Sequence, residues 1–409
     1  MKKNIFILTT LAVFLTSFWG CDALLGTKKD PTVDDVFQQG NIDPTTIVSN
    51  VGYVPINPVW YFNQPTDVYV GYDEMVYVTD ADGLHILDQK GTKFKTIPIP
   101  NATDVTQDRR LLTYVIGRVN YPVTIGTNTQ IKSLPAIYII KNAPTNNPQI
   151  IDTLIHPFCD ITRASIPFRP QDEQVSFTGI ATLHDNTFYV SRTGIVNTGT
   201  GFPAPDNAVL VFDKNFNNTN YINELDPINT NLRSVVKPTS IASFAAPPQL
   251  VSGISTSKDF LLTQKTGLET EYAVLWIKRI DDADLGTVYT ENATLLVQDT
   301  SKADRFLYQP FRFSQPEDVC VAPDASGYIF VVDSGKDSLF IFNRAGYEGV
   351  NKPANSNFRK QVLASFGGLG NGPKQFNNPV GVAYFRKMIY VADKNNNRVC
   401  RFKLSTDLQ

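Results

Sequence analysis

Residues 376–402 read FNNPVGVAYFRKMIYVADKNNNRVCRF, and the pattern of this stretch occurs three times in the chain. Each copy has a Phe-x-x-Pro turn, a short strand pattern, a second turn and an aromatic-centred strand pattern that ends in Asp. The other two copies run from Phe62 to Asp80 and from Phe313 to Asp333. A unit that is copied along a chain indicates a repeat architecture, so the fold follows from the number of copies.

Three weaker copies lie between the first strong copy and the last two. Two of them have a ten-residue spacing between the residue that opens the first strand and an aromatic residue in the second: Asp104 and Tyr114, and Gly179 and Tyr189. A poorer match begins at Gly253. The third strands expected for the six copies are Leu84–Leu87, Ala136–Ile140, Ala208–Phe212, Ala273–Ile277, Leu339–Phe342 and Val399–Phe402.

A fourth strand is expected ahead of each Phe-x-x-Pro turn, most clearly at residues 361–366. Four-stranded antiparallel units that repeat around one axis make a β-propeller. The last copy ends after three strands, and its unpaired edge would be a liability. Residues 50–61 stand where the missing strand is needed. We therefore predict an all-β, six-bladed β-propeller of four-stranded antiparallel blades, with the last blade closed by an N-terminal strand.

The first 20 residues have the pattern of a bacterial signal peptide, in which two lysines precede an apolar run over residues 5–18. The Gly-Cys junction at Cys21 resembles the lipobox of bacterial lipoproteins, which implies lipidation of this cysteine and attachment to a membrane. An ordinary cleaved signal with an incidental cysteine is the alternative. Residues 21–48 are polar and are expected to form a flexible tether. The propeller is expected over residues 49–409.

The charge composition argues against a nucleic-acid partner. The chain has 37 Lys and Arg residues against 39 Asp and Glu residues, whereas nucleic-acid-binding proteins usually carry a basic excess. Three cysteines follow Cys21, and because three is an odd number at least one of them is unpaired. Cys320 and Cys400 lie in apolar strand patterns, so buried free thiols are favoured over a disulfide.

The strongest copies resemble the NHL repeat. The resemblance rests on Phe366–Gly370, the turn that begins at Phe376, the strand Ile389–Asp393 and the Asn-Arg pair at residues 397–398. The copy at residues 313–342 follows the same pattern except for that pair. This resemblance implies a six-bladed propeller. It does not imply one activity, because the fold is shared by lyases, lactonases, RNA-binding proteins and scaffolds.

The residue that opens the inner strand of each copy is expected near the mouth of the central channel. NHL-like repeats commonly have glycine there, but three copies have Asp67, Asp104 and Asp318. Three carboxylates can hold a hard cation such as Ca²⁺, which prefers oxygen ligands. The alternative is that each aspartate accepts hydrogen bonds from nearby turn amides. For the aspartates that end the aromatic-centred strands, a structural role in bracing the next loop is favoured.

The connections between second and third strands are long in the second copy, Gly117–Pro135, and in the third, Ser191–Asn207, and intermediate in the fourth. Consecutive blades are neighbours, so these loops predict one asymmetric ridge on one face. Aromatic and polar residues on such loops are typical of recognition surfaces. Tolerated insertions without a ligand are the alternative. The expected ligand contacts are Arg118, Tyr121, Arg192 and Phe202.

Two functions follow from these features. The leading hypothesis is a non-enzymatic lipoprotein, anchored in the outer membrane on its periplasmic face or at the cell surface. Its monomeric propeller would bind a protein, peptide or glycan without a cofactor. The alternative is a hydrolase or lyase similar to calcium-dependent lactonases, with Asp67, Asp104 and Asp318 around Ca²⁺. A three-histidine zinc site is not favoured because the histidines occupy no comparable repeat positions, and nucleophile and phosphate-binding motifs are missing from the sequence.

Overall fold

The computed structural model divides the chain into two units, Met1–Asn50 and Val51–Gln409. The described residues all belong to the second unit. They are 51–198, 203–228, 233–245, 255–266, 272–284, 286–353 and 356–408. The predicted signal peptide, Cys21 and the tether lie outside them. In the part of the chain that is described, none of the helices has the length and apolar character needed to cross a membrane.

The first three blades are four-stranded antiparallel sheets. Blade 1 consists of β3 (Asp67–Val70), β4 (Val76–Asp80), β5 (Gly83–Leu87) and β6 (Lys93–Ile97). Blade 2 consists of β7 (Asp104–Gln107), β8 (Thr113–Ile125), β9 (Asn128–Lys141) and β10 (Gln149–Ile155). Blade 3 consists of β11 (Ser176–Thr182), β12 (Phe188–Thr193), β13 (Ala208–Phe212) and β14 (Asn218–Tyr221).

The other three blades complete the ring. Blade 4 consists of β15 (Pro238–Ser243), β16 (Phe260–Gln264), β17 (Val274–Asp282) and β18 (Gly286–Glu291). Blade 5 consists of β19 (Pro316–Val321), β20 (Ile329–Asp333), β21 (Ser338–Phe342) and β22 (Phe366–Gly367). Blade 6 consists of β23 (Pro379–Phe385), β24 (Met388–Asp393) and β25 (Arg398–Leu404), together with β1 (Tyr53–Pro55) and β2 (Trp60–Tyr61).

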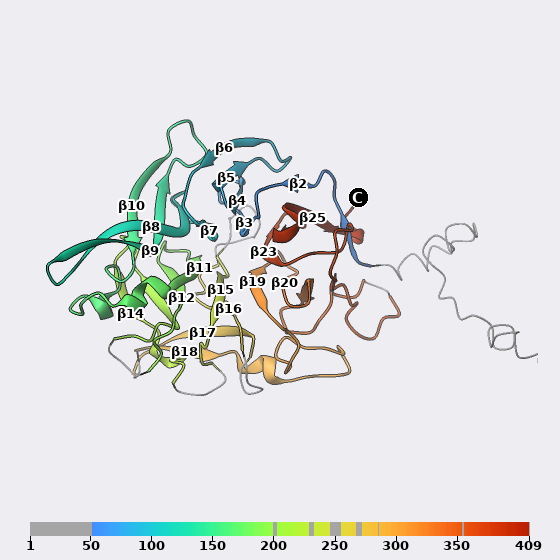
Figure 1. The fold of residues 1–409 in the computed structure, drawn as a ribbon. Coiled ribbons are helices and arrows are strands. Elements are labelled where there is room, and N and C mark those ends of the chain that lie inside the picture. The colour runs from blue at the N-terminus through green and yellow to red at the C-terminus, as the bar shows by residue number, and fades with distance from the viewer. Residues whose placement is uncertain are drawn as a thin grey trace, which may run out of the picture. The chain divides into compact units, whose positions relative to one another are not determined.

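Short 3₁₀ helices lie in the connections between these strands. They are η2 (Ile161–Arg163), η3 (Pro170–Gln174), η4 (Asn223–Leu225), η6 (Ala293–Leu296), η7 (Lys394–Asn396) and η8 (Ser405–Asp407). The inner strands β3, β7, β11, β15, β19 and β23 contact one another in ring order and surround a common axis (Figure 1). The predicted six-bladed propeller is confirmed.

One β-branched residue from every inner strand packs between neighbouring blades. Its side chain is between 2% and 4% exposed in all six blades. Val and Ile suit this place because they have high strand propensity and pack well on a pleated surface. The six residues are Val68, Val105, Ile180, Ile241, Val319 and Val382.

The N-terminal strands close the last blade, as predicted. Tyr53 of β1 lies opposite Leu404 of β25, and Trp60 of β2 lies opposite Val399 farther along the same strand. Trp60 is 6% exposed, and the Arg401 guanidinium lies 4.4 Å from the centre of its ring. The two ends of the described chain therefore share one sheet, and β25 is paired on both sides.

The aspartates that end the second strands brace the Phe-x-x-Pro turns. The Asp333 carboxylate accepts hydrogen bonds from the backbone amides of Ser314 (2.6 Å) and Gln315 (3.0 Å). Asp80 and Asp393 accept from the equivalent turns of their own blades, at 3.0 and 2.7 Å. The repeated sequence pattern thus reflects one repeated contact, and the structural interpretation of these aspartates is confirmed.

Three details differ from the sequence expectations. The inner strand of blade 4 is β15, not a segment at Gly253, because a long connection separates β15 from β16. The long segment Gly117–Pro135 is not an irregular loop but the outer half of the β8–β9 hairpin. The fourth strand of blade 5 is only two residues long. The described cysteines, Cys159, Cys320 and Cys400, are free thiols, as expected.

Candidate functional site

The channel on the propeller axis is the first candidate site. The residue that opens each inner strand contributes to one ring around it. Three of these six residues are carboxylates, which is unusual for a position inside a protein. The ring is formed by Asp67, Asp104, Gly179, Ser240, Asp318 and Gly381.

Each ring aspartate links its blade to the next. Asp67 Oδ2 accepts a hydrogen bond from the backbone amide of Val105 at 3.0 Å, and Asp104 Oδ2 accepts from Ile180 at 3.2 Å. Asp318 Oδ2 accepts from Val382 at 2.7 Å. Hydrogen bonds from backbone amides to a carboxylate are stronger than neutral ones. The three aspartates therefore have a structural role at the blade interfaces. These partners are strand amides of the next blade, whereas the sequence interpretation expected amides of nearby turns.

The glycines of the ring occupy places where the blades come closest. A Cβ atom at Gly179 would lie 2.8 Å from the Ile241 backbone nitrogen, and one at Gly381 would lie 2.7 Å from the Asp67 Cα. Neither distance leaves room for a side chain. Only glycine fits at these two positions, whereas each ring aspartate reaches the backbone amide of the neighbouring blade.

Burial and mutual repulsion raise the pKa values of the three carboxyl groups. For Asp67, burial is the largest cause, followed by the charges of Asp104 and Asp318. For Asp104, burial and then Asp318 raise the pKa well above its usual value. Burial raises the pKa of Asp318 to about 6, although hydrogen bonds from Ser240 and Val382 lower it. The ring therefore holds protons at a pH where exposed aspartates are ionised.

Cavities lie on both sides of the ring. A cavity of about 120 Å³ reaches it from one side and is lined by Tyr69, Thr106 and Tyr384 among others. A constriction of about 30 Å³ and a wider mouth of about 420 Å³ lie on the other side. Lys265 and Glu317 line this mouth, and their charged atoms are 2.9 Å apart. The spaces on either side of the ring are large enough to hold a small cation.

The three ring carboxylates do not form a ready coordination group. In the described part of the chain, one set of three His, Cys, Asp or Glu ligand atoms lies within 4.8 Å of one another, and it is in blade 1 rather than in the channel. Direct coordination of one ion by all three ring aspartates would need the carboxylates to move closer together. A cation in the channel would have to retain some of its water ligands.

Asp104→Asn is expected to stabilise the protein at pH 8. The raised pKa means that the folded protein binds more protons than the unfolded chain, so the stability contribution of the ring falls as pH rises from about 4 through about 6. Asparagine keeps an acceptor for the Ile180 amide and removes the charge. We expect Tm at pH 8 to rise by about 2–4 °C, which corresponds to ~1 kcal/mol, and the difference to vanish near pH 4. Thermal unfolding across pH measures this, and a lower Tm at pH 8 would contradict it.

The second candidate site is the β8–β9 hairpin, where the ridge was expected. Tyr121 is 36% exposed and its ring lies 5.2 Å from that of Phe158, which is 54% exposed. Arg118 is half-buried and donates hydrogen bonds to the carbonyl oxygens of Ser133 (2.6 Å) and Glu173 (2.8 Å). Arg118 therefore fixes the base of the hairpin, whereas Tyr121 presents an aromatic surface.

Two other residues of the expected ridge do not contribute to this surface. Arg192 is 1% exposed, and its guanidinium contacts the Asp160 carboxylate at 2.5 Å and the carbonyl oxygens of Pro205 and Asp206. It lies one residue before the end of β12, at the place that aspartate has in blades 1, 5 and 6, and it is a buried structural residue rather than a ligand contact. Phe202 lies outside the described residues.

Sequence reasoning missed two members of these sites. Ser240 completes the ring, and its signal was the tripeptide Thr239-Ser240-Ile241, which matches Thr66-Asp67-Val68 and Thr178-Gly179-Ile180. The match was missed because more residues separate Ser240 from the next aromatic strand than in the other copies. Phe158 follows a fourth strand, and only its contact with Tyr121 across the fold assigns it to the hairpin surface.

Comparison with known proteins finds one family match and several distantly similar structures. The NHL repeat model matches residues 376–402, and no curated protein matches the chain. A structural genomics protein of unknown function from Bacteroides thetaiotaomicron is 14% identical, with 87% of this chain and 76% of that chain covered and a TM-score of 0.48. An auxiliary nutrient binding protein from Bacteroides ovatus is 11% identical, with 87% and 73% covered and a TM-score of 0.48.

A streptogramin B lyase structure is 10% identical, with 87% of this chain and 98% of that chain covered and a TM-score of 0.43. Identities this low do not extend a relative's activity to this chain. The matched repeat spans all of β23 and β24 and most of β25, all in blade 6. The protein is a six-bladed β-propeller that carries an NHL repeat in its last blade.

Proposed function

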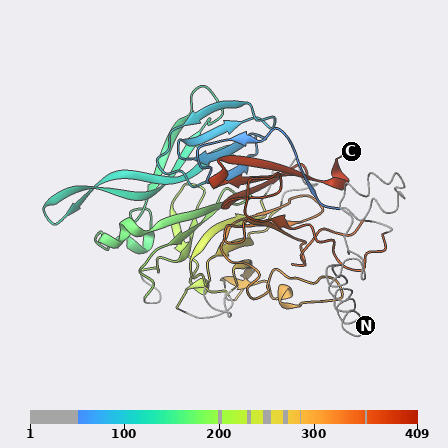
Figure 2. The same ribbon diagram turned by 45° about the vertical axis from the view of Figure 1, so that its right-hand side comes forward.

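We propose that the protein is an exported binding platform, anchored to the outer membrane through lipidated Cys21, whose β8–β9 hairpin contacts a protein, peptide or glycan. The observation that carries this proposal is the hairpin itself. It extends well beyond its own blade and projects from the propeller (Figure 1 and Figure 2). A long projecting hairpin does not stabilise the core of a ring, so a role in recognition accounts for it.

The hairpin presents apolar side chains from a well-braced support. Near its tip, Ile125 is 41% exposed and Ile131 is 67% exposed. One face packs inward, because Val123 is only 4% exposed and Lys132 contacts the Glu173 carboxylate at 3.0 Å. A rigid ribbon loses little conformational entropy when it binds, which favours affinity.

The hairpin lies on the same side of the ring as the wide channel mouth. Asp104, which opens β7, pairs with Ile116 of β8, and the hairpin continues from there past the start of the inner strand. A partner on the hairpin would therefore be on the same side of the ring as the mouth lined by Lys265 and Glu317. The near-neutral composition and export make a protein, peptide or glycan a better partner than nucleic acid.

The double variant Tyr121→Ser/Ile131→Ser removes one exposed apolar side chain from each face of the hairpin. It is expected to weaken partner binding at least tenfold, or ~1.4 kcal/mol, because these contacts are lost without a change in the core. Candidate partners are captured by crosslinking in the cell envelope and by glycan arrays, and affinities are then measured with purified components. Ile150→Ser is the matched control, since Ile150 is 50% exposed in the same blade but lies on β10. Equal affinities for all three proteins would overturn the proposal.

A second candidate function is a lactonase- or lyase-like activity that depends on Ca²⁺ in the channel. The observation that favours it is the set of three carboxylates that line the cavities on both sides of the ring. Under this hypothesis Ca²⁺ raises Tm at pH 8, and Asp67→Asn and Asp318→Asn abolish both this effect and any lactone hydrolysis. A Tm that does not respond to millimolar Ca²⁺ would exclude it, while leaving the platform proposal intact.

A further inference from the structure

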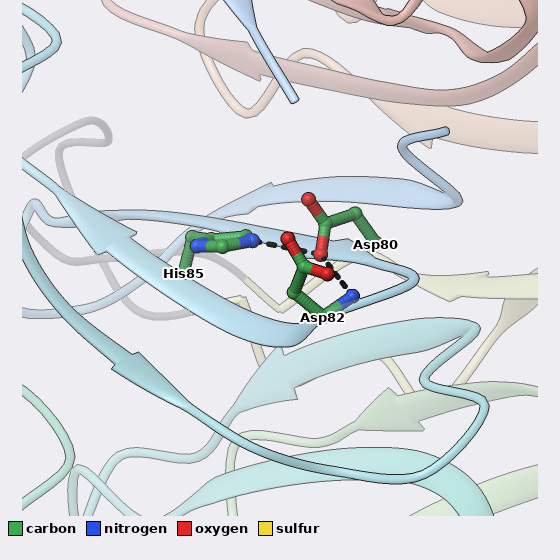
Figure 3. A group of neighbouring side chains, drawn as sticks. All are labelled: Asp80, Asp82 and His85. Atoms are coloured by element: carbon green, nitrogen blue, oxygen red, sulfur yellow. Dashed lines mark hydrogen bonds and ion pairs between the residues drawn. The ribbon is translucent and has the colours of Figure 1, made fainter. Parts of the chain in front are cut away.

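Blade 1 contains a group of three side chains that neither the channel nor the hairpin uses. Asp80 ends β4, Asp82 lies in the two-residue turn that follows, and His85 lies on β5 (Figure 3). Two carboxylate oxygens and one imidazole nitrogen of this group all lie within 4.8 Å of one another. Within the described ranges, this is the one set of His, Cys, Asp or Glu side chains with that geometry.

His85 is held in the way that metal-binding histidines usually are. It is 2% exposed, and its Nδ1 lies 2.9 Å from Thr96 Oγ1, which fixes the plane of the ring. Nε2 faces the carboxylates and lies 2.7 Å from Asp80 Oδ1, but the two atoms are not aligned as a hydrogen bond. This buried nitrogen thus points at the carboxylates and is paired with Asp80, while the other nitrogen has an orienting partner.

The other repeats show what the fold itself requires at this turn. Asp333 and Asp393 occupy the same strand-end position as Asp80, and neither belongs to a comparable group of ligand atoms. The bracing role of Asp80 is fulfilled by the amides of Asn63 (3.0 Å) and Asp82 (2.8 Å). The imidazole of His85 and the carboxylate of Asp82 are additional to this role.

The chemistry of the donors suits a zinc ion. Two carboxylates balance the charge of a divalent cation, and an imidazole nitrogen favours Zn²⁺ over Ca²⁺ or Mg²⁺. Asp82 is exposed, so water can reach the group and complete the coordination. Ligands ~2.1 Å from a tetrahedral ion stand roughly 3.4 Å apart, so the contact between His85 and Asp80 has to open by less than ~1 Å.

We propose that Asp80, Asp82 and His85 bind one Zn²⁺ ion. The Asp82 carboxylate also accepts a hydrogen bond from Asn63 Nδ2 at 3.0 Å. The ion would therefore connect the β4–β5 turn to the Phe-x-x-Pro turn of blade 1, which follows directly after the closing strand β2. Zinc binding would strengthen the ring next to the point where its two ends meet.

Calorimetric titration of the purified protein with Zn²⁺ tests the proposal, with the Co²⁺ absorption spectrum reporting the ligand type. We expect one ion per chain and a spectrum of nitrogen and oxygen ligands without thiolate bands. Asp82→Asn should weaken Zn²⁺ binding at least tenfold, and Thr96→Val should weaken it about tenfold through the orientation of His85. Both positions are exposed, so both variants should fold.

Asp284→Asn is the matched control, because Asp284 is an exposed aspartate in blade 4 that lies outside any such group. His85→Gln should abolish binding, with the unfolding temperature of the metal-free protein showing that it is folded. Failure to bind Zn²⁺, thiolate bands in the Co²⁺ spectrum, or equal affinities for Asp82→Asn and the control would overturn the assignment. None of these outcomes bears on the hairpin proposal.

Discussion

Deletion of residues 51–61 is expected to destabilise the whole propeller rather than to loosen one blade. β1 and β2 both pair with β25, and they form the outer edge of blade 6. Without them the core between blades 5 and 6 loses Val51 and Tyr53, which are 9% and 2% exposed. A ring closed by strand exchange is cooperative, so we expect Tm to fall by at least ~10 °C, or several kcal/mol for a domain of this size. Thermal and urea unfolding measure this loss, and unchanged melting would refute the closure.

Two neighbouring residues of β2 offer a point-variant form of the same test. Trp60 is 6% exposed and packs under the Arg401 guanidinium, whereas Tyr61 is 75% exposed. Trp60→Ala should cost ~3–5 kcal/mol, as large-to-small changes of buried aromatics do. Tyr61→Ala should stay within ~0.5 kcal/mol of the wild type. Similar values for both variants would mean that β2 is not packed as described.

The fold was predictable because its signals are local and repeated. A Phe-x-x-Pro turn, a strand and a terminal aspartate recur wherever the turn amides need the same acceptor, as at Asp333. The closing strand was predictable because the last copy ended one strand short. The inner strand of blade 4 was not, because 16 residues, 244–259, separate β15 from β16 and break the regular spacing.

The candidate sites were less predictable because they depend on contacts between blades. The sequence placed Asp67, Asp104 and Asp318 in one ring, but their raised pKa values come from burial and from one another. Arg192 looked like a loop residue because its partner Asp160 lies in a different connection. A contact between residues in different connections cannot be predicted from the spacing of residues along one copy of the repeat.

Asp333→Ala is expected to be among the most destabilising single changes outside the apolar core. The carboxylate is fully buried and accepts hydrogen bonds from four backbone amides. The amide nitrogens of Ser314, Gln315, Gly335 and Lys336 lie between 2.6 and 3.0 Å from its oxygens. An unsatisfied buried amide costs ~1–3 kcal/mol, and water can reach part of this turn, so we expect a total loss of ~3–5 kcal/mol.

Asp333→Asn keeps one acceptor oxygen and should lose roughly half as much. Asp304→Ala is the control in the same part of the chain, because this carboxylate is 76% exposed and is paired with Lys360. Its loss should cost less than ~0.5 kcal/mol. Urea unfolding of the three variants ranks them directly. If Asp333→Ala lost less than ~1 kcal/mol, the repeated aspartate would not be needed to hold the turn, and its recurrence in three blades would then require a functional explanation.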